Sequence, residues 1–202
     1  MKGLKSRIAA GLMATAAFAA SPAVLAQEQS HKVYIGGAYG STKLTGGCDD
    51  VRDAFASLGG TTTSCSDKDN GWKIFGGYQV NKNFAVEATY IDWGAIKGSG
   101  RVGTIPVNVS GDATSFGVAA VGILPLNERF AVFGKAGILM TDTSVSAQAG
   151  AATASEDDSS TELHIGVGAL FNVTERFAIR AEWERATDTK IDMISIGVQF
   201  RF

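Results

Sequence analysis

The chain has 202 residues, 45% of them hydrophobic and 19% charged, and its formal net charge is −2. This length predicts a single domain. The mildly acidic balance argues against nucleic acid as a partner, because nucleic-acid-binding domains carry clustered basic residues.

The N-terminal segment has the three parts of a cleavable signal peptide. Basic residues come first, an apolar stretch runs from residue 8 to about residue 20, and small residues lead up to Ala26. That stretch is too short for a membrane anchor, which needs roughly 20 apolar residues. We therefore expect a signal peptide at residues 1–26 and a mature domain at residues 27–202.

Beyond residue 27, apolar and polar residues alternate. The longest apolar run, Phe116 to Leu126, is about half the roughly 20 residues of a membrane-spanning helix. Near the end of the chain, the even positions from Ile194 to Phe202 are large and apolar, whereas the odd positions between them are small or polar. A period of two indicates a strand with one apolar face and one polar face.

A turn motif recurs along the chain. Segments 81–86, 127–132 and 174–179 each join a polar turn to a strand that begins Phe-Ala, and their phenylalanines are 46 and 47 residues apart. This period indicates a repeated unit of strand, long loop, strand and short turn. In chain order, the expected strands span residues 32–42, 70–80, 84–94, 112–124, 130–141, 161–172, 177–187 and 191–202.

An even number of strands, with short turns on one side and longer loops on the other, is typical of bacterial outer-membrane barrels. The expected lengths also match the roughly 9–11 residues that a tilted strand needs to cross a membrane. Lipid admits only helices and closed barrels, because backbone polar groups must be paired internally. The sequence therefore predicts an all-β fold, an eight-stranded antiparallel transmembrane up-and-down β-barrel.

Aromatic residues near the strand ends are expected to face outward and form girdles at the two membrane interfaces. They are Tyr39, Trp72, Tyr90, Trp93, Trp183, Phe200 and Phe202. A soluble lipid-carrying barrel would reverse the two faces, with apolar residues inside. Alternation alone does not separate these possibilities, and the signal peptide, the short turns on one side and the terminal phenylalanine favour the membrane.

The first long loop contains the two cysteines of the chain, Cys48 and Cys65. In an exported protein such a pair most simply forms a disulfide, and a metal site is less well supported because companion ligands are lacking. The residues between them have helical spacing, with Asp50 as a candidate N-cap and Gly59 at the C-terminal end. Such a helix could be an interaction surface, or it could simply stiffen a solvated loop.

A later loop, residues 143–160, is rich in Ala, Ser and Thr, and we expect it to be solvated and mobile. Its acidic triplet at residues 156–158 could bind divalent cations, although a solvated charged loop is the commoner case.

The predicted polar faces carry cations and carboxylates in equal number. They are Lys73, Lys135, Arg180 and Arg201, and Glu87, Glu162, Glu182 and Glu184. An eight-stranded barrel is just wide enough for its side chains to fill, so we expect a salt-bridged plug in the lumen, with His164 beside Glu162. Catalysis would need a nucleophile on the same face as His164, but position 166 is glycine. We therefore expect no enzyme, and no catalytic, cofactor-binding or metal-binding residues.

Three segments resemble the transmembrane barrel of the OmpA-like outer-membrane proteins: residues 71–87, residues 121–130 and the closing residues 197–202. The resemblance covers roughly residues 32–202. It implies four surface loops, both termini in the periplasm of a Gram-negative bacterium, and Phe202 as the signal read by the barrel-assembly machinery. It also implies outer-membrane lipid and lipopolysaccharide as surroundings. Larger members continue into a periplasmic peptidoglycan-binding domain, which this sequence does not contain.

These observations favour a structural outer-membrane barrel that contributes to envelope integrity, with surface loops that could contact a ligand the sequence does not identify. A second interpretation is a low-conductance pore for ions or small solutes, and a third, less well supported, is a lipid-modifying enzyme.

Overall fold

The computed structural model describes residues 32–150 and 152–202, so the expected signal peptide lies outside the described residues. The elements in chain order are β1 Val33–Leu44, α1 Gly47–Ser57, β2 Thr61–Ser66, β3 Lys68–Asn81, β4 Phe84–Val102, β5 Ile105–Pro125, β6 Phe130–Ala149, β7 Ala152–Asn172, β8 Phe177–Ala186 and β9 Ile191–Arg201. Among the described residues, no helix is long and apolar enough to cross a membrane.

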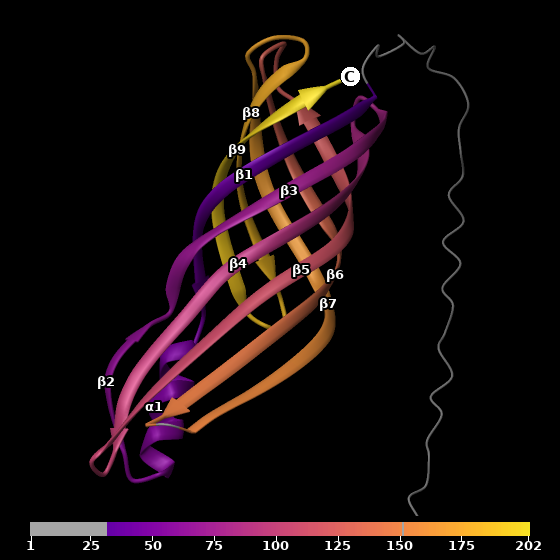
Figure 1. Ribbon diagram of the computed structural model, residues 1–202. Helices are drawn as coiled ribbons and strands as arrows, with labels where there is room; N and C mark the ends of the chain where they lie inside the picture. Colours follow the sequence, from indigo (N-terminus) through magenta and orange to yellow (C-terminus); the bar gives the residue numbers. More distant parts are fainter. Residues whose placement is uncertain (1–31, 151) are drawn as a thin grey trace, which may run out of the picture.

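Eight of the strands close into a ring (Figure 1). Neighbours follow the order β4-β3-β1-β9-β8-β7-β6-β5, and β5 pairs back with β4. Every pairing in the ring is antiparallel. The remaining strand, β2, lies outside the ring and pairs with the part of β4 that is far from the barrel. The predicted eight-stranded up-and-down barrel is therefore confirmed.

Both ends of the described chain lie at one end of the barrel, where the amide of Phe202 donates to the carbonyl of Val33. The recurring turns lie there too. The first polar side chain of each turn explains why the turn motif recurs along the chain. Asn81 Oδ1 and Asn127 Oδ1 each accept hydrogen bonds from the amides two and three residues ahead, at 2.8–3.0 Å, and Thr174 Oγ1 does the same at 3.3 and 3.0 Å. Such side chains replace a backbone partner in a tight turn. We call this the short-turn end.

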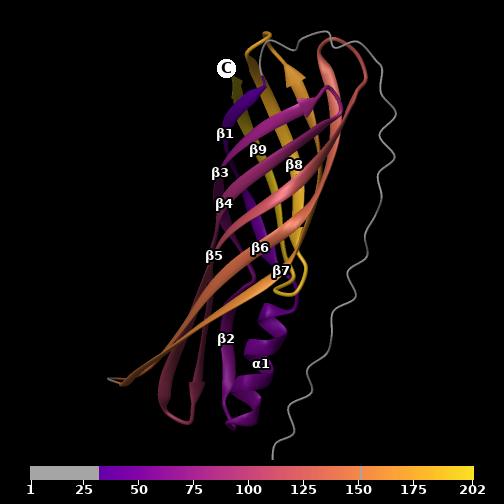
Figure 2. The same cartoon turned by 90° about the vertical axis from the view of Figure 1, so that its right-hand side faces the viewer.

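At the opposite, long-hairpin end, β4, β5, β6 and β7 continue well beyond the barrel (Figure 2). β4 runs to Val102 and β6 to Ala149, against expected ends at residues 94 and 141. The expectation of a mobile loop at residues 143–160 is therefore wrong, because β6 and β7 pair continuously from the barrel out to Ala149 and Ala152. Polar Ser144, Ser146 and Gln148 alternate with Val145, Ala147 and Ala149 on β6, and the loop-like composition hid this weak period of two.

The helix α1 packs against the extended hairpins, and its N-terminus lacks the side-chain cap that the sequence predicts. It begins at Gly47 without a side-chain cap, so Asp50 lies in the first turn and does not act as N-cap. Gly59 follows the helix with a φ of 70°, a conformation that glycine adopts at no steric cost. The Phe55 side chain is buried and leaves no room for a Cβ at Gly100 of β4. The predicted disulfide is confirmed, and it joins Cys48 of α1 to Cys65 of β2.

The strands alternate between an exposed apolar face and a buried face, as expected. On β9, Ile194 and Ile196 are 68% and 64% exposed, whereas Met193 and Ser195 are buried. The expected outward position of Trp93 is wrong, since its side chain is only 2% exposed. Trp93 has the odd parity of the inward residues of β4, and Tyr90, three positions earlier, has the opposite parity and faces outward.

Candidate functional site in the barrel interior

Inward-facing charged side chains from four strands of the ring meet in the lumen. β8 contributes three in succession at every second position, and β3, β4 and β6 contribute one each. All six are at most 5% exposed: Lys73, Glu87, Lys135, Arg180, Glu182 and Glu184. We call this set the lumen network.

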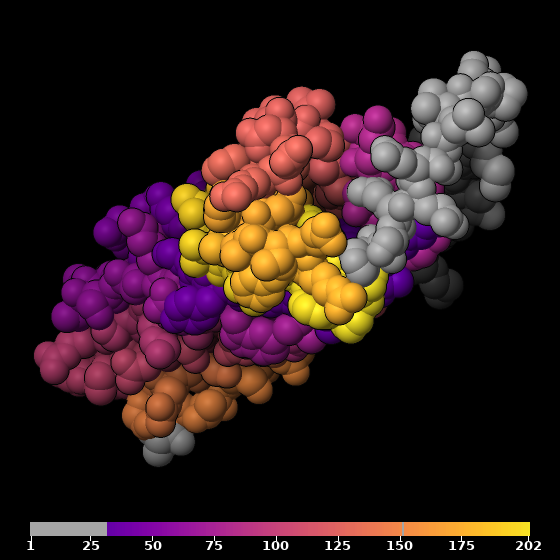
Figure 3. All heavy atoms as spheres, turned by 90° about the horizontal axis from the view of Figure 1, so that it is seen from above, coloured from indigo at the N-terminus to yellow at the C-terminus, as the bar shows by residue number. Residues whose placement is uncertain are grey.

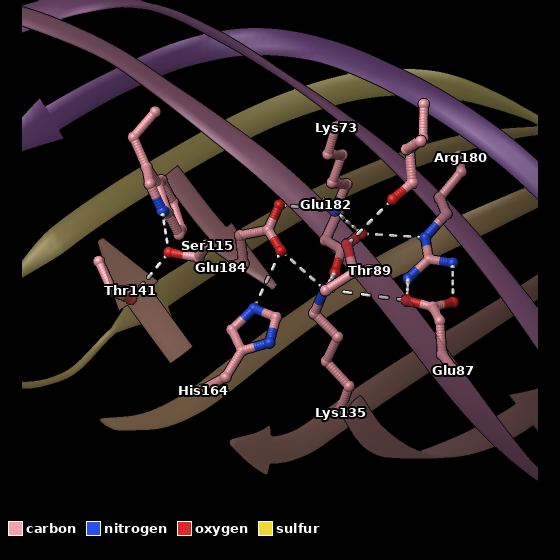
Figure 4. A network of polar contacts seen from close by, with 12 residues as sticks. Lys73, Glu87, Thr89, Ser115, Lys135, Thr141, His164, Arg180, Glu182 and Glu184 are labelled. Atoms are coloured by element: carbon pink, nitrogen blue, oxygen red, sulfur yellow. Dashed lines mark hydrogen bonds and ion pairs between the residues drawn. The ribbon is translucent and has the colours of Figure 1, made fainter. Parts of the chain in front are cut away.

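Two lysines from opposite sides of the ring converge on the same pair of carboxylates (Figure 4). Lys73 Nζ donates to Glu182 Oε2 and Glu184 Oε1, both at 2.6 Å. Lys135 Nζ lies 2.5 Å from Glu182 Oε1 and 2.7 Å from Glu184 Oε2. Each carboxylate therefore has a lysine at both of its oxygens, an arrangement that ties β3 and β6 to β8 across the lumen.

Arg180 forms the second half of the network. Its Nη1 and Nη2 donate to the two oxygens of Glu87 at 2.6 and 3.1 Å, and its Nε donates to Glu182 at 2.9 Å. The guanidinium carbon lies 4.4 Å from the ring centre of Phe75 and 4.3 Å from that of Phe133. A bidentate pair held between two aromatic faces is strong and geometrically specific.

The charges in the network balance, because three cations face three carboxylates. His164 of β7 adds a hydrogen bond, with Nε2 3.0 Å from Glu184 Oε2. Tyr34 of β1 donates its hydroxyl to Glu87 Oε2 at 3.0 Å. Removing one member would leave a buried charge without its partner, which costs far more free energy than losing an exposed ion pair.

Two of the charges expected in the plug lie elsewhere. Glu162 is buried, and its hydrogen-bond partners among the described residues are Thr141, Asp188 and Thr189, not His164 or a cation. It accepts backbone hydrogen bonds from Asp188 and Thr189, both at 2.9 Å, and therefore holds the turn between β8 and β9. Arg201 is half-buried at the short-turn end, where its Nη1 donates to Asn172 Oδ1 at 2.9 Å.

An apolar layer that is absent from the predictions made from the sequence lies next to the lumen network. Ile91, Leu139 and Met193 are fully buried there, together with Trp93, whose indole donates to Ser115 Oγ at 2.7 Å. The signal was present on β4, where Glu87, Thr89, Ile91 and Trp93 follow each other at every second position. Polar residues in the middle of the barrel thus give way to apolar ones toward the long-hairpin end.

Cavities lie at both mouths of the barrel. The one at the short-turn end has a volume of about 420 Å³ and reaches Arg180, and the one at the long-hairpin end has about 260 Å³ and reaches Trp93. The lumen network and the apolar layer separate them. Figure 3 views the molecule from the short-turn end, where the turn between β5 and β6 (salmon) lies beside the turn between β7 and β8 (orange). Within the described residues, no group of three or more His, Cys, Asp or Glu side chains is placed to hold a metal ion.

The family model of the outer membrane protein beta-barrel domain matches residues 10–202. The chain belongs to this family. Among solved structures, this outer membrane barrel is similar to Ail, the attachment invasion locus protein of Yersinia pestis, at 20% identity and a TM-score of 0.51, over 85% of this chain and 97% of Ail. It is also similar to Neisserial surface protein A, at 15% identity and a TM-score of 0.53, over 84% and 97% of the two chains. At such identities the likeness shows the fold. A search of curated proteins found no match.

Proposed function

We propose that this outer membrane barrel is a structural, non-enzymatic protein with a sealed lumen, and that its long-hairpin end presents a surface outside the cell. The lumen network is the observation that carries the proposal. Its six charged side chains fill the width of an eight-stranded barrel and bind one another, which leaves little room for water. The apolar layer beside it adds a second barrier to ions.

The orientation follows from the short-turn end. In bacterial outer-membrane barrels the short turns face the periplasm and the longer loops face outward. We place both termini in the periplasm, following a signal peptide at residues 1–26 that is removed on export. Phe202 is 60% exposed and packs edge-on against Phe200, with ring centres 5.1 Å apart. This exposed pair is accessible to the barrel-assembly machinery, and the apolar outer faces suit outer-membrane lipid and lipopolysaccharide.

The long-hairpin end is acidic. Segments 43–70, 94–112, 142–161 and 187–192 contain six lysines and arginines and twelve aspartates and glutamates, so their net charge is 6 − 12 = −6. Ail has been crystallised with the heparin analogue sucrose octasulfate, a polyanion. The acidic surface of this barrel opposes polyanions, and we expect it to favour neutral or cationic partners.

Single-channel conductance of the mature protein in a planar bilayer tests the sealed lumen. We expect rare, small openings for the unmodified protein, and more frequent or larger ones for Lys135→Ala, because water enters where the ammonium group was. Lys82→Ala, in an exposed short turn, is the matched control and should behave like the unmodified protein. Large, stable, ohmic channels in the unmodified protein would replace the structural proposal with the pore. Turnover of labelled lipopolysaccharide would instead support an enzyme.

A further inference from the structure

Beyond the barrel, apolar residues of β4, β5 and β6 lie on one face of the sheet, and a bulge in β4 brings the apolar residue of that strand onto it. On β7 the same face carries Glu156, the partner of Val145. The pairing of β4 with β5 shifts by one residue between Asp92 and Ala95, where Gly94 has a φ of 78°. The shift turns Ile96 onto the face that Trp93 occupies in the barrel, so the apolar lining continues outward. Directly paired residues share a face of an antiparallel sheet. Val109 and its partner Ala147 therefore extend this inner face farther from the barrel.

Where this inner face meets the barrel, it borders the open cavity of about 260 Å³ at the long-hairpin end. Trp93 and Ile191 belong to the apolar layer beneath the cavity, and Leu44 packs against that layer. Ile96 and Val145 line the cavity on the side of the extended hairpins. Ligand pockets for drug-sized molecules occupy about 300–1,000 Å³. This cavity therefore fits one ring or a short alkyl chain.

The charged residues that line the cavity are all aspartates: Asp67, Asp69 and Asp112. Asp112 alternates with the inward Gly111 and Ala113 and its side chain is exposed on the outer face, so the carboxylates at the cavity are those of Asp67 and Asp69. Asp69 accepts backbone hydrogen bonds from Ala95 and Asn70, both at 2.8 Å. These hydrogen bonds, with a smaller effect from Lys97, lower the pKa of the Asp69 carboxyl and keep it ionised at neutral pH. None of the described residues that line the cavity is a lysine, an arginine or a histidine.

We propose that this cavity is a binding site for a small amphipathic cation, such as an arylalkyl amine, taken up from outside the cell. The apolar group of the ligand lies against Trp93 and Ile96, where it is removed from water. The ammonium group lies beside the aspartate carboxylates, and their negative charge complements its positive charge. An anion of the same shape meets like charges and is excluded, so the site selects by charge as well as by size.

Three ligands that share a phenethyl group test the proposal: phenethylamine, phenethyl alcohol and phenylacetate. The mature protein in lipid nanodiscs is titrated with each by calorimetry, with empty nanodiscs as the control for partitioning into lipid. We expect the amine to bind most tightly, the alcohol more weakly and the carboxylate not measurably. Amine binding should also change the emission of Trp93, measured in a protein whose Trp72 and Trp183 are replaced by phenylalanine.

Two variants separate the apolar and the charged parts of the site. Val145→Trp fills the cavity from its open side, where the valine is 43% exposed, and should weaken both amine and alcohol at least tenfold. Asp67→Asn should weaken the amine several-fold and leave the alcohol unchanged. Asp157→Asn, on an exposed position of β7, is the matched control and should change neither.

The heat-shifted gel mobility of folded barrels shows that each variant is folded before it is titrated. Equal affinity for amine and alcohol, unaffected by Asp67→Asn, would overturn the charge selectivity. Binding of none of the three ligands, or binding that Val145→Trp leaves intact, would overturn the site itself. Neither result bears on the sealed lumen, which the conductance experiment tests independently.

Discussion

Replacing Lys135 by alanine should destabilise the barrel far more than any exposed lysine does. The ammonium group of Lys135 contacts Glu182 at 2.5 Å and Glu184 at 2.7 Å, and the side chain is fully buried. In the variant, two cations remain to balance three carboxylates in a lumen with little water. Glu182 Oε1 also loses its donor, whereas Glu184 Oε2 keeps only its contact with His164 Nε2.

The size of the effect follows from these contacts. Removing one partner of a buried ion pair costs about 3–5 kcal/mol, because the remaining charge stays buried and uncompensated. An exposed ion pair contributes about 0–1 kcal/mol, so we expect Lys82→Ala, which removes an exposed lysine, to change the free energy of unfolding by no more than this. Even the lower figure for Lys135→Ala corresponds to roughly a hundredfold change in the unfolding equilibrium constant.

Reversible urea unfolding in lipid vesicles, followed by tryptophan fluorescence, measures the difference. The double variant Lys135→Met with Glu182→Gln restores the balance at two cations and two carboxylates, and we expect it to recover much of the lost free energy. The reasoning is refuted if Lys135→Ala and Lys82→Ala unfold at the same urea concentration. It is also refuted if the double variant is less stable than Lys135→Ala alone.

Three further predictions follow from the proposed orientation and from the disulfide. An epitope tag at Gly150 should be accessible to antibody on intact cells and one at Glu128 should not, and surface labelling at Glu128 would reverse the topology. Deleting Phe202 should lower the heat-modifiable fraction in the outer membrane and leave unfolded protein in the periplasm, whereas a normal yield would argue against its role in assembly. The Cys48–Cys65 disulfide stabilises the hairpin region by about 3 kcal/mol at most, through closure of its loop. Reducing it should therefore expose α1 to protease and leave the barrel folded. Loss of the gel shift on reduction would contradict this last expectation.

Much of this protein could be predicted from its sequence, because its strongest signals are local. The period of two along β9 identifies both faces of that strand without any other part of the chain. The side chains of Asn81, Asn127 and Thr174 bond to amides two and three residues ahead, so the short turns are encoded where they occur. Turns and alternation together determine the number of strands and their up-and-down order.

The tertiary structure decided which inward charges meet. Alternation places Glu162 and Glu184 on the same inner surface, but it does not give their heights in the barrel or their neighbours across the lumen. Closure of the ring brings Glu184 to Lys73 and Lys135, and leaves Glu162 beside the turn between β8 and β9. Ion pairs depend on distances of a few ångströms between strands far apart in sequence, and these distances depend on the register of every pairing around the ring.

The same reason explains the long-hairpin end. Residues 143–160 are small and polar enough to read as a loop, yet residues 143–149 and 152–160 form strands because β6 leaves the barrel already paired with β5 and β7. The bulge at Gly94 likewise depends on a partner strand, because it consists of one extra residue on β4 that has no partner on β5. A sequence determines which face a residue takes within its own strand, whereas the partner strands determine how far that strand continues and what its face lies against.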